Sequence, residues 1–343
     1  MRGKGINYDT GFINNAGVST HEPFDPEIVK REMRIIHDAL HCNAVRITGG
    51  DLDRLETAAI HAAATGLEVW LCPFTCELTT EELLDFLADC AERAERLRRQ
   101  GAEVVLLTGS ELGLFTKGFL PGETLAERVA LVADPLRLRP MIGEVRARIN
   151  DFLRRAVGVV RARFSGKVSY AALPLEGVDW APFDIIATDA AYRSAVTAER
   201  FRENIRAFVA QGRAQGKPVA VTEFGCGTHR GAAGVAGHAN SIMVWGDDGR
   251  DPRLNGEYVR DEDEQATYLR ELLEVFEAEG VDSAFVYTFA IYNLPHRSDP
   301  REDLDMASYG VVKVLEGRLG HIYPDMAWEP KAAFTVLADY YRG

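Results

Sequence analysis

Residues 104–111 read VVLLTGSE, an uninterrupted apolar run followed by a short polar turn and a glutamate. An apolar run without polar alternation is typical of a strand that is covered on both faces, as in a parallel sheet flanked by helices. Residues 284–287, AFVY, show the same pattern. These two runs favour an α/β fold whose sheet is buried.

Segments with helical spacing separate eight such runs along the chain. In one segment, Val29, Met33, Ile36 and Leu40 recur at the spacing of a helix that packs on one side. We predict strands at residues 5–8, 44–48, 68–73, 104–108, 167–173, 184–188, 218–222 and 283–287. Eight units of a strand followed by a helix favour a closed (β/α)8 barrel, or TIM barrel, over an open doubly wound sheet.

The chain is longer than this fold requires. It has 343 residues, whereas a (β/α)8 barrel typically needs ~250. We expect the surplus in extended loops after strands 4, 7 and 8, at residues 115–140, 225–260 and 289–328. No linker rich in Gly, Ser or Pro divides the chain, so we expect a single domain over residues 1–343.

The charge balance excludes some classes of partner. The chain carries 39 basic and 52 acidic residues, a formal net charge of −13, which argues against nucleic acid or an anionic membrane surface. No apolar run approaches the ~18 residues of a bilayer span, and the first residues, MRGKGINYDTGF, lack the apolar core of a signal peptide. The five cysteines show no CxxC spacing, so we expect a reduced, cytoplasmic setting.

The sequence also lacks the glycine-rich loops that bind nucleotide cofactors. No GxGxxG follows the first predicted strand, and no GxxxxGK[ST] string occurs. We therefore expect no cofactor. The sequence leaves the oligomeric state open.

Polar residues stand at the carboxyl ends of the predicted strands, where the chemistry of a barrel is located. Glu111 and Glu223 each follow an apolar strand directly, in VVLLTGSE and VAVTE, and each precedes a turn that contains glycine. An unpaired carboxylate at the edge of an apolar barrel is costly to bury, so each glutamate needs a partner or a function. The other candidates at these strand ends are Tyr8, Asp9, Arg46, Ser110, Asp189, Tyr192 and Tyr287.

This arrangement resembles the retaining glycoside hydrolases of the large (β/α)8 clan that includes cellulases, β-mannanases and β-galactosidases. The string TEFG, residues 222–225, is similar to the clan's ending of strand 7. The resemblance implies that Glu111 is the acid/base and Glu223 the nucleophile. It also implies that Arg46 and Tyr192 lie beside the nucleophile.

Two positions depart from the pattern of the clan. The clan usually has asparagine before the acid/base glutamate, where this chain has Ser110. It also commonly has tryptophan at the end of strand 8, where this chain has Tyr287 in the string YTFAIY. These departures leave the sugar and the linkage open.

The chemistry of glycoside cleavage assigns different roles to the two carboxyls. In a retaining enzyme they stand ~5–5.5 Å apart, and two like charges at that distance cannot both ionise readily, so one pKa must rise. We expect Arg46 and Tyr192 to hold Glu223 as the anion and Glu111 to keep its proton. The leading hypothesis is a retaining hydrolase of carbohydrate metabolism that acts on a small carbohydrate or glycoside.

Two alternatives stay open. One is a barrel protein that binds sugars without hydrolysing them, and Ser110 is the feature that favours it. The other is a metal-dependent barrel enzyme, for which His21 and Glu22 are candidate ligands. The predicted strand ends lack the set of His, Asp and Glu residues that such enzymes use, so we expect no metal.

Overall fold

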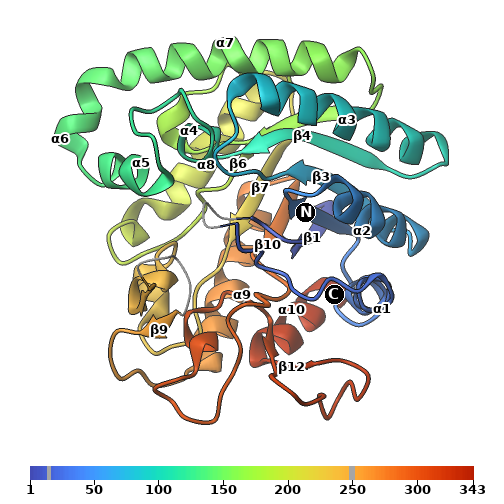
Figure 1. Cartoon of the computed structure of the whole chain (residues 1–343), viewed down its shortest axis with the longest axis vertical. Coiled ribbons are helices and arrows are strands. Elements are labelled where there is room, and N and C mark those ends of the chain that lie inside the picture. Colours follow the sequence, from blue (N-terminus) through green and yellow to red (C-terminus); the bar gives the residue numbers. More distant parts are fainter. Residues whose placement is uncertain (14–16, 247–251) are drawn as a thin grey trace.

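The computed structural model describes residues 1–13, 17–246 and 252–343, which form a barrel of parallel strands surrounded by helices (Figure 1). The barrel strands are β1 (Gly3–Asp9), β2 (Ala44–Gly49), β3 (Glu68–Pro73), β4 (Val104–Ser110), β5 (Lys167–Ala171), β6 (Ile186–Thr188), β7 (Val219–Phe224) and β10 (Ser283–Val286). They pair in the order β5-β4-β3-β2-β1-β10-β7-β6. A bridge between Ala172 and Thr188, next to β5 and β6, brings the two edges together. The predicted (β/α)8 barrel and its eight strands are confirmed.

Helices cover the outside of the barrel. The longer ones are α1 (Pro26–Asp38), α2 (Leu52–Ala64), α3 (Thr80–Arg99), α7 (Ile142–Arg161), α8 (Ala198–Ala214), α9 (Glu262–Glu279) and α10 (Ala332–Arg342). Side chains of Asp25, Asp51 and Thr79 cap the first turns of α1, α2 and α3, which satisfies amides that have no partner within the helix. Only a 3₁₀ turn, η2 (Pro174–Glu176), stands between β5 and β6. None of the helices in the described part of the chain has the length and hydrophobicity that a bilayer span requires.

The extended loops lie after β4, β7 and β10, as predicted. They contain α4 (Leu112–Phe115), α5 (Leu125–Val132), α6 (Pro135–Leu138), η1 (Arg139–Met141), η3 (Ala232–Val235), η4 (Ala239–Ile242), β8 (Met243–Val244), β9 (Arg253–Leu254), η5 (Leu304–Ala307), β11 (Val312–Val314) and β12 (Trp328–Pro330). β8 pairs with β9 and β11 with β12, both antiparallel. These loops build the walls above the barrel mouth.

The barrel interior is filled with apolar side chains below the mouth. The rings of Trp70 and Phe285 lie 4.7 Å apart and are fully buried. Gly5 faces them, and a Cβ at this position would lie 2.3 Å from the Phe285 ring. Arg46 is also fully buried on β2, two residues after Ala44 of this inner layer. The guanidinium of Arg46 is therefore buried next to an apolar layer, and its charge needs carboxylate partners there.

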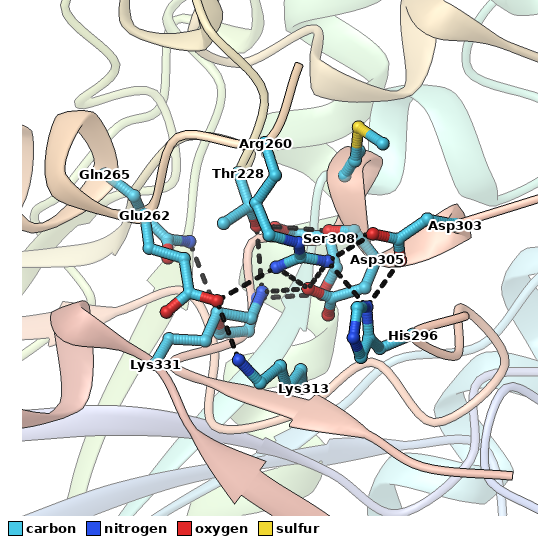
Figure 2. Close-up of polar contacts among 12 residues, drawn as sticks. Thr228, Arg260, Glu262, Gln265, His296, Asp303, Asp305, Ser308, Lys313 and Lys331 are labelled. Atoms are coloured by element: carbon cyan, nitrogen blue, oxygen red, sulfur yellow. Dashed lines mark hydrogen bonds and ion pairs between the residues drawn. The ribbon is translucent and has the colours of Figure 1, made fainter. Parts of the chain in front are cut away.

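A cluster of ion pairs joins the loop after β7 to the loop after β10 (Figure 2). This loop ion cluster consists of Arg260, Glu262, Asp303, Asp305, Lys313 and Lys331. Arg260 contacts Asp303 at 2.7 Å, and Lys331 contacts Asp305 at 2.8 Å. Because Glu262 and Lys331 also stand at the beginnings of α9 and α10, the cluster fixes both loops to the outer helices.

Candidate active site

A one-residue irregularity in β4 brings Glu111 to the barrel mouth. Between Leu107 and Ser110, β4 advances three residues while β5 advances two, and Gly109 adopts a φ of 123° within this segment. Bulges of this kind re-aim the side chains that follow them. Glu111 then has a φ of 48°, in the left-handed region, and its side chain lines a cavity above the barrel.

β7 carries the same irregularity. Between Val221 and Phe224, β7 advances three residues while β10 advances two. Side chains alternate between the two faces of a regular strand, and Ala220 belongs to the inner layer, so a regular strand would turn Glu223 outward. The additional residue turns Glu223 inward instead, and its side chain lines the same cavity as Glu111.

The cavity has a volume of about 370 Å³. Of the predicted site residues, those that line it are Asp9, Glu111, Tyr192, Glu223 and Tyr287. The structure therefore brings residues at the carboxyl ends of β1, β4, β6, β7 and β10 to one place. Tyr309, from the loop after β10, also lines the cavity and was not among the predicted residues.

Glu223 is held by two donors. Arg46 Nη1 donates to Glu223 Oε1 at 2.7 Å, and the hydroxyl of Tyr192 donates to Oε2 at 3.0 Å. Burial and the charge of Asp189 raise the pKa of Glu223 to about 7, although Arg46 and Tyr192 act in the opposite direction. Glu223 is therefore readily ionised near neutral pH.

Arg46, Ser110 and Asp189 lie in a layer beneath the cavity. Arg46 Nη2 donates to Asp189 Oδ2 at 3.2 Å, and the Ser110 hydroxyl donates to the same oxygen at 2.5 Å. All three residues are buried, and none of them lines the cavity. The structure thus does not place these three predicted substrate contacts at the cavity surface; of the three, Arg46 contacts Glu223 directly.

Glu111 has a different environment. Its carboxyl oxygens have no hydrogen-bond partner among residues 1–13, 17–246 and 252–343. Burial raises the pKa of Glu111 well above its usual range, and the charges of Glu223 and Asp189 raise it further. Glu111 is therefore protonated under conditions in which an exposed glutamate is ionised.

The prediction for Tyr8 is wrong. Its ring is fully buried, and its hydroxyl donates at 2.5 Å to Glu32, a buried residue of α1. Asn7 and Asp9 take the inward positions of β1, because neighbouring residues of a strand point to opposite faces. Tyr8 consequently faces the helices and does not reach the cavity.

Two residues that hold parts of the site in place were not predicted from the sequence. Asn7 accepts from Arg46 at 3.0 Å and donates to the Thr222 carbonyl at 2.9 Å; the alternation on β1 was the signal that identifies it. Glu176 accepts from the amide of Gly113 at 2.8 Å, which fixes α4 just after Glu111. No pattern in the sequence marks Glu176, because η2 is too short to show a period.

The candidate metal ligand His21 makes other contacts in the structure. Its ring stacks on Tyr292 with centroids 3.6 Å apart, and its Nδ1 lies 2.8 Å from the carbonyl oxygen of Asp9. Within the part of the chain that the structure describes, no group of three His, Cys, Asp or Glu residues is placed to hold a metal ion.

The same architecture occurs in solved glycoside hydrolases. A GH113 β-1,4-mannanase shares 17% sequence identity over 100% of both chains, with a TM-score of 0.61. A GH113 β-mannanase from Alicyclobacillus acidocaldarius has 17% identity and a TM-score of 0.58, with 99% of this chain and 97% of that chain covered. This chain has a glycoside hydrolase-like TIM barrel fold.

A third structure extends the comparison to a larger enzyme. The β-glucuronidase from Parabacteroides merdae has 13% identity and a TM-score of 0.56, with 99% of this chain and 36% of that chain covered. No family model matches the sequence, and no curated protein matches it significantly. At these identities the likeness establishes the fold but not the chemistry of the cavity.

Proposed function

We propose that this protein is a retaining glycoside hydrolase in which Glu223 is the nucleophile and Glu111 the acid/base. This proposal rests on the difference between the hydrogen-bond partners of the two carboxyl groups. Glu223 accepts hydrogen bonds from Arg46 and Tyr192, whereas Glu111 has no partner in the described chain and a strongly raised pKa. One cavity therefore holds a carboxylate and a carboxylic acid together, as glycoside cleavage requires.

The first half of the reaction uses both groups at once. Glu111 donates its proton to the glycosidic oxygen while a Glu223 oxygen attacks the anomeric carbon, so the leaving group departs as a neutral alcohol. Arg46 and Tyr192 orient Glu223 for this attack. A covalent glycosyl ester on Glu223 results.

The second half follows from the electrostatics of the cavity. Esterification removes the charge of Glu223, which is one of the causes of the raised pKa of Glu111. The pKa of Glu111 therefore falls, and Glu111, now ionised, takes a proton from the water that attacks the ester. Hydrolysis returns both groups to their initial state.

The test is hydrolysis of a panel of 4-nitrophenyl glycosides. We expect Glu223→Gln to lower kcat/KM by at least ~10⁴-fold whatever the leaving group. Glu111→Gln should cost ~10²–10⁴-fold with a poor leaving group, because general acid catalysis is worth about that much, and far less with 4-nitrophenol. Full activity of both variants would refute the assignment.

The stereochemistry of the product tests the mechanism separately. Retention of anomeric configuration, followed by NMR during turnover, is expected for carboxyls ~5–5.5 Å apart, whereas inversion requires ~6.5–9.5 Å. Activity that a chelator abolishes would instead favour a metal-dependent enzyme.

A sugar-binding barrel without hydrolysis is the second candidate. The hydroxyl of Ser110 donates to Asp189 at 2.5 Å and is buried, so it does not offer a hydrogen bond to a sugar in the cavity. Tight binding of a sugar without turnover, measured by calorimetry, would support this candidate over the hydrolase.

A further inference from the structure

Three phenylalanines from three different strand ends form one wall of the cavity. Phe12 follows β1, Phe74 follows β3, and Phe115 ends α4. The centroids of their rings are 4.9 Å (Phe12 and Phe74), 5.5 Å (Phe12 and Phe115) and 4.8 Å (Phe74 and Phe115) apart. Each side chain is only partly buried. This phenylalanine wall leaves apolar surface open to the cavity, as ligand sites do.

The phenylalanine wall lies on the side of the acid. Glu111 and Phe115 are four residues apart across α4, and the amide of Phe115 donates to the Glu111 carbonyl at 3.2 Å. The side chains of both residues line the cavity. If Glu111 protonates the leaving group, as proposed above, the leaving group departs next to Phe115.

Apart from Glu111, the carboxylate on this side, that of Asp9, is already hydrogen-bonded to the protein. The Asp9 carboxylate accepts from the amides of Gly11 at 2.9 Å and Phe12 at 3.1 Å, and it also accepts from the hydroxyl of Thr20. A sugar hydroxyl placed against the phenylalanine wall would lose its hydrogen bonds to water and gain few in return, which is unfavourable.

Another part of the cavity lining consists of tyrosines. Tyr192, Tyr287 and Tyr309 line the cavity around Glu223, and the rings of Tyr287 and Tyr309 are 5.4 Å apart. The hydroxyl of Tyr287 has no protein partner in the described ranges. The cavity thus offers hydroxyl groups beside the nucleophile and bare aromatic rings beside the acid.

We infer that the substrate is a small glycoside with one sugar unit and an apolar aryl or alkyl aglycone. The sugar lies against the tyrosines, and the aglycone packs on the phenylalanine wall. The volume of about 370 Å³ is near the lower end of the ~300–1,000 Å³ of small-molecule sites, which suits one sugar and one ring better than a chain of sugars. This inference rests on the proposed function for the position of the leaving group.

The test measures binding without turnover. For each common hexose and pentose, calorimetry compares the phenyl 1-thioglycoside, the methyl 1-thioglycoside and the S-linked disaccharide, none of which is readily hydrolysed. We expect the phenyl compound of the preferred sugar to bind at least tenfold more tightly than the other two. Phe74→Ala and Phe115→Ala should each reduce this preference about fivefold and leave the methyl compound within twofold.

Two further variants control for indirect effects. Phe208→Ala removes an equally partly buried ring from α8, outside the cavity, and should leave the preference unchanged. Phe115→Leu keeps apolar surface and should restore part of the preference that Phe115→Ala loses. Circular dichroism establishes that each variant is folded.

The outcomes separate this inference from the proposed function. A disaccharide that binds as tightly as the phenyl compound, equal losses for phenyl and methyl compounds in the variants, or no binding by any member of the panel would overturn the inference. Hydrolysis that depends on both glutamates, together with no phenyl preference, would leave the proposed function standing alone. A phenyl preference without any hydrolysis would support the aglycone site and refute the hydrolase.

Discussion

Two buried polar clusters of this protein differ in charge balance. Among the residues that the structure describes, the loop ion cluster has the cations Arg260, Lys313 and Lys331 against the carboxylates Glu262, Asp303 and Asp305, and His296 contacts Asp303 at 3.0 Å. The cavity cluster, as we name the group of Arg46, Glu111, Asp189 and Glu223, has one cation, Arg46, against three carboxyl groups. The first cluster therefore has equal numbers of cations and carboxylates, whereas the second has a single cation for three carboxyl groups.

The carboxyls of the two clusters also differ in pKa, although burial raises the pKa of Asp305 in the loop ion cluster as well. Burial acts to raise the pKa of Asp303, but hydrogen bonds from His296 and Arg260 outweigh it and the pKa is lowered. Burial likewise raises the pKa values of Glu111 and Glu223, and there the single arginine does not outweigh it. The ion pairs of the loop ion cluster hold the loops together, whereas the shortage of cations at the cavity favours the protonated form of Glu111.

Removal of Arg46, the cation of the cavity cluster, should have the largest effect on stability. Arg46→Met leaves Asp189 and Glu223 buried without a counter-charge, so we expect the free energy of unfolding to fall by about 3–5 kcal/mol. The pKa of Glu223 should rise further, which lowers kcat/KM at pH 7 by about 10- to 1,000-fold. Urea unfolding and the pH profile of hydrolysis measure the two effects. A variant with unchanged stability and an unchanged profile would contradict the role of Arg46.

The corresponding change in the loop ion cluster should affect stability more than chemistry. Lys331 is buried and contacts Asp305 and Thr228 at 2.8 Å, while Arg260 still contacts Asp305 in its absence. We expect Lys331→Met to cost about 2–4 kcal/mol of stability and, at a temperature where the variant is folded, less than tenfold in kcat/KM. The partly exposed Lys313 provides the control, because Lys313→Met should cost only about 0–1 kcal/mol. An inactive but stable Lys331→Met variant would contradict this distinction.

A change at Glu111 should stabilise the protein while it impairs catalysis. Because the pKa of Glu111 is higher in the folded than in the unfolded chain, the folded state binds more protons and stability falls as pH rises above about 4.3. Glu111→Gln removes this loss, so we expect a gain of about 0.5–2 kcal/mol at pH 7 and a smaller gain at pH 5. Urea unfolding at both pH values measures it, with the exposed Glu203→Gln as control. A variant less stable than wild type at pH 7 would show that Glu111 is stabilising.

The fold was predictable because its signal is distributed over the whole chain. Eight apolar runs and the helical stripes between them each bury surface on a parallel sheet, so a misplaced end of β5 or β7 does not change the topology. The ends of strands carry no such redundancy. The bulges that turn Glu111 and Glu223 inward are one-residue shifts in register. The two glutamates were identified because a carboxylate at the end of a buried strand needs a partner or a function.

Which residues gather at the site was easier to predict than which of them reach the cavity. Arg46 and Asp189 were found, but the sequence does not show that they lie below the cavity, since this depends on how far each strand extends past its neighbours. Tyr8 was assigned to the wrong face, although alternation with Asp9 was available to exclude it. Glu176 acts through the backbone of Gly113, a contact between two loops that no local pattern encodes.

The smallest expected effect concerns Asp189, the third carboxylate of the cavity cluster. Asp189 shares Arg46 with Glu223, and its charge is, after burial, the main cause of the raised pKa of Glu223. Asp189→Asn removes that charge at nearly constant shape, so the pKa of Glu223 should fall. The acidic limb of the kcat/KM profile, where Glu223 loses its charge, should therefore move to lower pH by about one unit.

The sign and size of the change in rate follow from the wild-type pKa of about 7. At pH 7 about half of Glu223 is already ionised, so the gain in kcat/KM cannot exceed about twofold, whereas at pH 6 a one-unit shift gives about a fivefold gain. Ser110→Ala is the matched control: it removes a hydrogen bond to Asp189 but no charge, and should leave the acidic limb in place. A limb that moves equally in both variants would mean that Asp189 acts through its hydrogen bonds. The charge of Asp189 beside Arg46 would then not set the pKa of Glu223.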